Sequence, residues 1–116
     1  MKKKSRVKIC DELWAKVIKK RAGYQCERCH RTQLESKLDA HHIIGRQNYH
    51  LRYDLTNGIC LCFDCHINFA HCDPEGWHLW LMNNRERDYD YLNREKDIIA
   101  RNNYQEIEDK LRKYLK

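Results

Sequence analysis

The sequence contains no apolar run long enough to cross a membrane, and its lysine-rich start is not followed by the apolar stretch of a secretory signal. It has seven cysteines, and this odd number does not support a disulfide framework. Internal repeats and low-complexity linkers are also absent. We therefore expect residues 1–116 to form a single, reduced, intracellular domain in the cytoplasm, without a membrane partner.

Basic residues outnumber acidic ones by 23 to 17, which gives a formal net charge of +6. Many of them gather in the N-terminal part of the chain, at Lys2, Lys3, Lys4, Arg6, Lys8, Lys16, Lys19, Lys20 and Arg21. Such clustering favours a polyanionic partner. A basic tail over residues 1–9 and a solvated helix face are the alternative explanation, which needs no partner.

Apolar residues at helical spacing predict an amphipathic helix within residues 10–23. Leu13, Trp14 and Ile18 share one side of this helix, and Gly23 is placed to end it. The lysines then occupy the opposite side, so the helix buries one face and exposes the other.

The middle of the chain, residues 24–72, has the pattern of a small mixed core. Short apolar stretches at residues 38–44 and 58–61 predict two strands joined by a polar loop. A short helix is expected from Cys62 onward. The fold class predicted for the chain is therefore α+β.

Residues 73–116 predict a helical extension, which we assign to packing or to contact with a partner. Asp73 as a cap and Pro74 at the first helical position favour one helix, and Asn103 is placed to cap the last. Residues 88–101 are expected to be helical as well. The residues of this middle helix expected to face the core are Tyr89, Leu92 and Ile99.

Two pairs of cysteines have the spacing of a zinc site. Cys26 and Cys29 form the first pair, and Cys62 and Cys65 form the second. Four thiolates make a closed tetrahedral shell around a structural Zn²⁺. A core of roughly fifty residues is near the size that needs such a metal to remain folded, and zinc contributes an apparent ~10–16 kcal/mol in small peptides.

Three histidines lie around these cysteines. His41 and His42 are adjacent between the two pairs, and His66 directly follows Cys65. The ordered set CERC, LDAHHII and LTNGICLCFDCH, within residues 26–66, resembles the HNH endonuclease family. The resemblance implies a small zinc-stabilised ββα-metal core, treble-clef-like in form, flanked by an N-terminal helix and a helical tail.

By this resemblance, His41 and His66 are ligands of a catalytic divalent ion and His42 is the general base. Adjacent side chains on a strand point to opposite sides, so one imidazole can face the ion while its neighbour faces a water. Asn57 is expected to aim His42 through side-chain hydrogen bonds to the backbone of the loop. Arg46, just after the histidine strand, is placed to contact a substrate phosphate.

The reaction implied by the resemblance is metal-dependent hydrolysis of phosphodiester bonds, by nicking or double-strand cleavage. It leaves a 3′-hydroxyl and a 5′-phosphate, with one ion stabilising charge on the phosphate and on the leaving oxygen. The catalytic ion is expected to be Mg²⁺, Mn²⁺, Ni²⁺ or Zn²⁺.

The chain departs from the family pattern after His66. Several members of the family place a further histidine one helical turn later, where this chain has Ala70. His71 comes one residue after that position, and a five-residue step turns ~140° around an α-helix. We therefore expect His71 to be a helix-end histidine that turns away from the ion, unless the helix ends or distorts first.

The short chain and its order of motifs look similar to small stand-alone HNH proteins of phages. This resemblance implies a double-stranded DNA substrate rather than RNA, the host cytoplasm as the location, and a homodimer or a packaging or recombination partner. The main alternative is a zinc-stabilised nucleic-acid-binding module without catalysis. Thiol redox chemistry is a second alternative, but two CxxC pairs without a thioredoxin-like pattern favour metal binding.

Overall fold

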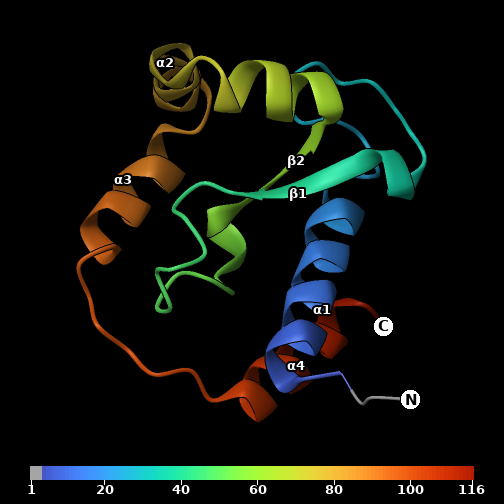
Figure 1. The fold of residues 1–116 in the computed structure, drawn as a ribbon, viewed down its shortest axis with the longest axis vertical. Coiled ribbons are helices and arrows are strands. Elements are labelled where there is room, and N and C mark those ends of the chain that lie inside the picture. The colour runs from blue at the N-terminus through green and yellow to red at the C-terminus, as the bar shows by residue number, and fades with distance from the viewer. Residues whose placement is uncertain (1–3) are drawn as a thin grey trace.

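The fold of the chain, in a computed structural model, is α+β (Figure 1). The structure describes residues 4–116, so Lys2 and Lys3 of the predicted basic tail lie outside it. Its regular elements are α1 (Arg6–Arg21), β1 (Leu38–His42), β2 (Gly58–Cys62), α2 (Pro74–Asn84), α3 (Glu86–Glu95) and α4 (Tyr104–Tyr114). Two 3₁₀ turns, η1 (Glu35–Lys37) and η2 (Leu55–Asn57), and a π-helix, η3 (Asp64–His71), complete the order.

Helix α1 begins earlier than the sequence pattern predicted. Ser5 caps it, because the Ser5 side chain accepts a hydrogen bond from the Lys8 amide at 3.1 Å. The helix ends before Gly23, whose φ of +65° is the left-handed conformation that glycine adopts at little cost. Trp14 and Ile18 on its inner face are almost completely buried, so α1 supplies one wall of the core.

Strands β1 and β2 pair antiparallel, with Leu38 opposite Cys62 and His42 opposite Gly58. The sequence predicted that the first strand would continue to residue 44, but it ends at His42. The reason is local: the Ile44 amide donates to the Asn57 side chain instead of to a backbone carbonyl. A side chain at Gly58 would overlap Ile18 and Trp14, so the glycine allows α1 to lie directly on the sheet.

The predicted short helix after Cys62 is η3, and its winding is that of a π-helix. Helix α2 follows as the sequence predicted. Asp73 caps it by accepting a hydrogen bond from the Gly76 amide at 3.0 Å, and Pro74 occupies its first turn. Helix α2 packs against η3, which brings the start of the C-terminal extension over the end of the core.

The predicted helix over residues 88–101 is wrong at both ends, because α3 covers Glu86–Glu95. Leu92 is buried as expected, but Ile99 is 99% exposed and takes no part in the core. The carbonyl of Lys96, just past the last turn, accepts a hydrogen bond from the Asn48 side chain at 2.8 Å. This contact ties the end of α3 to the loop after β1, and the chain then continues without regular structure.

Helix α4 returns to the N-terminal part of the molecule and lies beside α1 (Figure 1). Asn103 caps it as predicted, by accepting from the Glu106 amide at 3.2 Å. Its Leu111 is 2% exposed and joins the hydrophobic core. The first and last helices therefore share one core.

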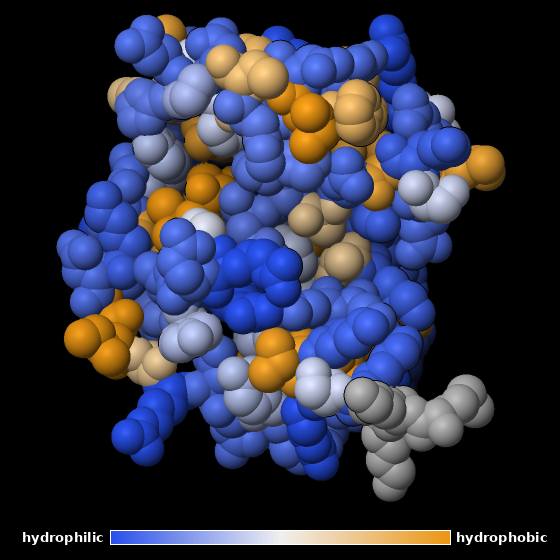
Figure 2. Space-filling view, viewed as in Figure 1, coloured by the Kyte–Doolittle hydropathy of each residue, from blue (hydrophilic) through white to orange (hydrophobic). Residues whose placement is uncertain are grey.

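The surface shown in Figure 2 is mainly hydrophilic, and its apolar residues form small separate groups. Apolar side chains exposed singly are ordinary on a folded domain. Within residues 4–116, no helix combines the length and the apolar character needed to cross a membrane.

Candidate metal centres

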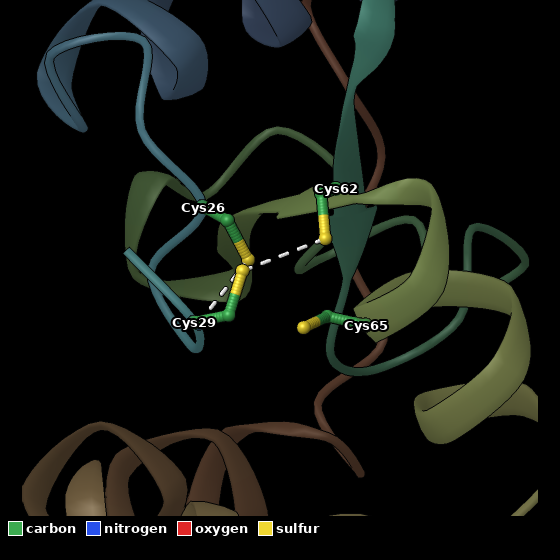
Figure 3. Close-up of side chains that lie close together, drawn as sticks. All are labelled: Cys26, Cys29, Cys62 and Cys65. Atoms are coloured by element: carbon green, nitrogen blue, oxygen red, sulfur yellow. Dashed lines mark hydrogen bonds between the residues drawn. The ribbon is translucent and has the colours of Figure 1, made fainter. Parts of the chain in front are cut away.

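The four cysteines of the CxxC pairs converge from three parts of the chain (Figure 3). Cys26 and Cys29 lie on the turn after α1, Cys62 ends β2, and Cys65 lies in the first turn of η3. Their sulfur atoms all lie within 4.8 Å of one another, and those of Cys29 and Cys62 are 3.7 Å apart. A tetrahedral Zn²⁺ with bonds of ~2.3 Å requires sulfur atoms about 3.8 Å apart, so the cluster fits a structural zinc.

The first CxxC pair forms a tight turn. The Cys26 carbonyl accepts from the His30 amide at 2.8 Å, and His30 itself has a φ of 65°. The Cys29 amide points at the Cys26 sulfur, 3.5 Å away. Burial opposes ionisation of Cys26, but backbone N–H groups, among them that of Cys29, outweigh burial and lower its pKa to about 7. The turn therefore favours the thiolate form that binds zinc.

The two residues inside this pair connect the zinc cluster to its surroundings. Arg28 donates to the Cys65 sulfur at 3.4 Å, and its guanidinium carbon lies 3.5 Å from the centre of the Phe69 ring. Glu27 accepts from the Cys60 amide at 2.6 Å and from the Arg85 guanidinium at 3.2 Å. Neither role could be predicted from the spacing of the motif.

A second cluster contains three histidines. His41 comes from β1, and His66 and His71 come from η3; one ring nitrogen of each lies within 4.8 Å of the others. The ring centres of His66 and His71 are 4.6 Å apart, and that of His41 is 4.8 Å from His66. Three imidazoles at these distances have the geometry of a transition-metal site with positions left for water or substrate.

The position of His71 corrects the expectation that it turns away. That expectation assumed α-helical winding, in which a five-residue step rotates the side chain to another face. Hydrogen bonds in a π-helix run from residue i to residue i+5, so residues five apart stack on one side. The π-helix of η3 therefore places His66 and His71 together.

His41 is half-buried under the start of the C-terminal extension. The edge of the Trp77 ring lies against it, with ring centres 5.6 Å apart. Burial is the main reason that the pKa of His41 falls to about 4, and His66 and His71 lower it further. The imidazole is therefore held in the neutral form that binds metal ions. No motif in the sequence marks the contact of Trp77 with His41.

His42 projects from the opposite face of β1. Its ring stacks on Trp14, with centres 3.9 Å apart and an interplanar angle of 8°. Its Nε2 atom lies 2.9 Å from the carbonyl oxygen of Arg52. Burial lowers the pKa of His42 below its ordinary value, although the bond to Arg52 opposes this. The two adjacent histidines thus occupy different environments, as alternation along a strand predicts.

The side chain of Arg52 is anchored by Asp11 on α1. The two Asp11 carboxylate oxygens accept from Arg52 at 3.0 and 2.7 Å. Arg46 donates to the same carboxylate at 3.1 Å, but its side chain is 61% exposed. Arg46 therefore lies at the surface near His42. Arg52 instead holds His42 through its carbonyl and is itself held by Asp11. No motif in the sequence marks the pairing of Asp11 with Arg52.

Asn57 is completely buried at the end of η2. Its side-chain oxygen accepts from the Ile44 amide at 2.7 Å, and its side-chain nitrogen donates to the carbonyls of Ile44 and Leu51 at 2.9 and 3.0 Å. One side chain thus holds both ends of the loop that follows β1. Its influence on the orientation of His42 stays a prediction.

Comparison with protein families adds an independent finding. Residues 26–68 match the family model described as HNH endonuclease, a span that includes both CxxC pairs, His41, His42, Asn57 and His66. Comparisons with curated proteins and with solved structures gave no match. The matched span coincides with the cysteine cluster and with two of the three clustered histidines. Residues 26–68 therefore resemble an HNH endonuclease domain.

Proposed function

We propose that the chain is a metal-dependent endonuclease that hydrolyses phosphodiester bonds of double-stranded DNA, leaving a 3′-hydroxyl and a 5′-phosphate. One observation carries this proposal: one histidine of the three-histidine cluster and a separately supported histidine are neighbours on β1. His41 faces His66 and His71, while the next residue, His42, faces away and is held by the Arg52 carbonyl. The nuclease family match over residues 26–68 supports the same reaction class.

His42 has the geometry of a general base. When its Nε2–H donates to the Arg52 carbonyl, the lone pair at Nδ1 is free to accept a proton from the attacking water. Stacking on Trp14 limits rotation of the ring. Asn57 holds the carbonyl of Leu51, the residue before Arg52, so it fixes the backbone that orients His42.

We assign His41, His66 and His71 as the ligands of the catalytic ion. A divalent ion there supplies the positive charge that stabilises the phosphate oxygen and the leaving 3′ oxygen. Imidazole nitrogen suits Zn²⁺ and Ni²⁺ better than Mg²⁺, which prefers oxygen ligands. Among the ions expected from the sequence, Zn²⁺ and Ni²⁺ therefore fit three histidines best.

Arg46 is the proposed contact to the DNA backbone. Its guanidinium lies at the surface beside the support of His42 and is held by Asp11 at 3.1 Å. An exposed ion pair of this kind contributes little to stability. Arg46 is therefore free to exchange the carboxylate for a phosphate, which guanidinium groups bind well.

The test is cleavage of supercoiled plasmid by the purified chain with Zn²⁺, Ni²⁺, Mn²⁺, Mg²⁺ or EDTA. His42→Ala should lower turnover by roughly 10²–10⁴-fold, the contribution of a positioned base. The matched control is His78→Ala, because His78 is exposed, bonds to Tyr89 in α3 and belongs to neither cluster. End-labelling of the products then identifies the terminal phosphate.

Cleavage that requires metal and is lost in His42→Ala alone would establish the activity and its base. Equal cleavage by His42→Ala would reject the assignment of the base. No cleavage with any ion, by a zinc-loaded chain that still binds DNA, would reject the nuclease in favour of a non-catalytic binding module.

A further inference from the structure

Asp39 lies on β1, two residues before His41, and therefore on the same face of the strand. Its carboxylate oxygen Oδ2 is 3.0 Å from Nδ1 of His66 on η3. The contact joins the strand that carries one histidine of the cluster to the helix that carries the other two. Asp39 lies in the LDAHHII stretch, but the sequence pattern assigns it no role.

The bond determines which nitrogen of His66 is available. A neutral imidazole carries one N–H and one lone pair, and a carboxylate accepts from the N–H. The Asp39 contact therefore places the proton on Nδ1 and leaves the lone pair on Nε2. Within residues 4–116, the His66 ring has a hydrogen-bond partner, whereas the rings of His41 and His71 have none.

We propose that Asp39 is a positioning residue for the three-histidine site, acting through His66. It selects the tautomer of His66 that presents Nε2 to the ion, and it makes the imidazole a stronger donor. This inference rests on the part of the proposed function that assigns a metal ion to the three histidines. It does not depend on what the loaded site cleaves.

Asp39 also sets the separation between the two ligand-bearing elements. The residue is paired with Leu61 in the sheet, so its backbone is fixed by β2. Its side chain then reaches from β1 to η3, and η3 begins at Asp64, just after the end of β2. Loss of the carboxylate removes this link while the cysteine cluster remains complete. Asp39 is therefore expected to affect the histidine site without affecting the zinc site.

The first measurement is metal affinity in the full chain with its structural zinc in place. Ni²⁺ and Co²⁺ are titrated by calorimetry, and the visible absorption of Co²⁺ reports its ligands. Asp39→Ala should weaken binding by roughly 10–100-fold, the usual effect of removing such a partner. Asp39→Glu should restore part of the loss, and Asp39→Asn should fall between, because it keeps an acceptor without the charge.

The matched control is Asp64→Asn. Asp64 is an exposed carboxylate in the first turn of η3, 3.7 Å from Arg31, and it is not part of the histidine cluster. Asp64→Asn removes one negative charge near η3, as Asp39→Ala and Asp39→Asn do, but it should leave the affinity for Ni²⁺ and Co²⁺ unchanged. Equal weakening by both variants would overturn the proposal, because it would reflect charge alone.

The second measurement is the tautomer of His66 in zinc-loaded chain without the second ion, from long-range ¹H–¹⁵N spectra. The wild-type ring should carry its proton on Nδ1, and Asp39→Ala should shift the population toward Nε2–H. Unchanged affinity in Asp39→Ala, or a wild-type ring protonated on Nε2, would overturn the proposal. Failure of the nuclease activity is a separate outcome, because neither measurement uses DNA.

Discussion

The cysteine cluster and the histidine cluster are neighbours in the chain, since Cys65 and His66 are consecutive, yet they differ in every property that governs metal chemistry. The first has four soft ligands, three of them buried. The second has three imidazoles, of which His71 is exposed. A full set of four protein ligands leaves no position for a reactant, whereas three ligands do. The contrast is therefore between a closed set of four ligands and an open set of three.

The largest effect is expected from breaking the closed site. Cys62→Ser should abolish the fold, because zinc at such a site supplies an apparent ~10–16 kcal/mol against a typical stability of ~5–15 kcal/mol. Zinc content and far-ultraviolet circular dichroism measure the loss. Cys72→Ser is the control, since Cys72 is exposed and outside the cluster. A folded, zinc-free Cys62→Ser chain would contradict the structural role.

Asn57→Ala tests the loop after β1, which carries the backbone bonded to the proposed base His42. The change leaves the Ile44 amide and two carbonyls without their partners, and we expect the free energy of unfolding to fall by roughly 2–5 kcal/mol. The zinc content should remain unchanged. Urea unfolding gives the measurement, with Asn68→Ala as control because the exposed Asn68 side chain bonds to Asp64 within η3. Equal stability of wild type and Asn57→Ala would reject the supporting role.

His71→Ala removes one of the three imidazoles and leaves the histidine site with two. Affinity for Ni²⁺ should fall by at least ~10-fold, the lower limit seen even when an outer partner is removed. One zinc should remain bound to the cysteines. Calorimetric titration of the zinc-loaded chain measures this, with His78→Ala alongside. If affinity is unchanged, the ion is bound by His41 and His66 alone, as the sequence pattern predicted.

Arg46→Gln should have the smallest effect. Loss of one phosphate contact lowers the slope of log affinity against log salt concentration by about 1 and weakens all DNA sequences alike. Binding is measured in the His42→Ala background so that the DNA stays intact. Arg112→Gln on α4 serves as the comparison, because it removes another exposed arginine paired with a carboxylate. If the salt dependence of binding is the same with and without Arg46→Gln in the His42→Ala background, Arg46 does not contact the DNA.

The parts of the fold that follow local rules could be predicted from the sequence. The Asp73 and Asn103 caps, the burial of one face of α1 and the order of strand, loop, strand and helix depend on neighbouring residues. The cysteine cluster was predictable because tetrahedral coordination restricts the spacing of its ligands. The prediction that Ile99 faces the core was wrong because α3 ends before it. Periodicity does not reveal that Asn48, far away in the sequence, bonds to the carbonyl of Lys96 at the end of α3.

The supports of the candidate site were not predictable, because they bring together residues that are distant in the sequence. Asp11 meets Arg52 only after α1 packs on the sheet, and Trp77 meets His41 only after α2 folds over η3. Asp39 and His66 both lie in the quoted motifs, but nothing in the sequence indicates that their side chains meet. Ligand chemistry can be recognised along a chain, but the groups that orient ligands depend on packing.

The winding of η3 has a consequence for how such sites are recognised in other chains. Two residues face one ion when they are one hydrogen-bonded turn apart, whether that turn contains four residues or five. A search that requires a fixed interval of four after His66 stops at Ala70 and discards the histidine beside it. The family match itself ends at residue 68. Aligning such helices by turns instead of by residue number would keep His71 within the searched pattern.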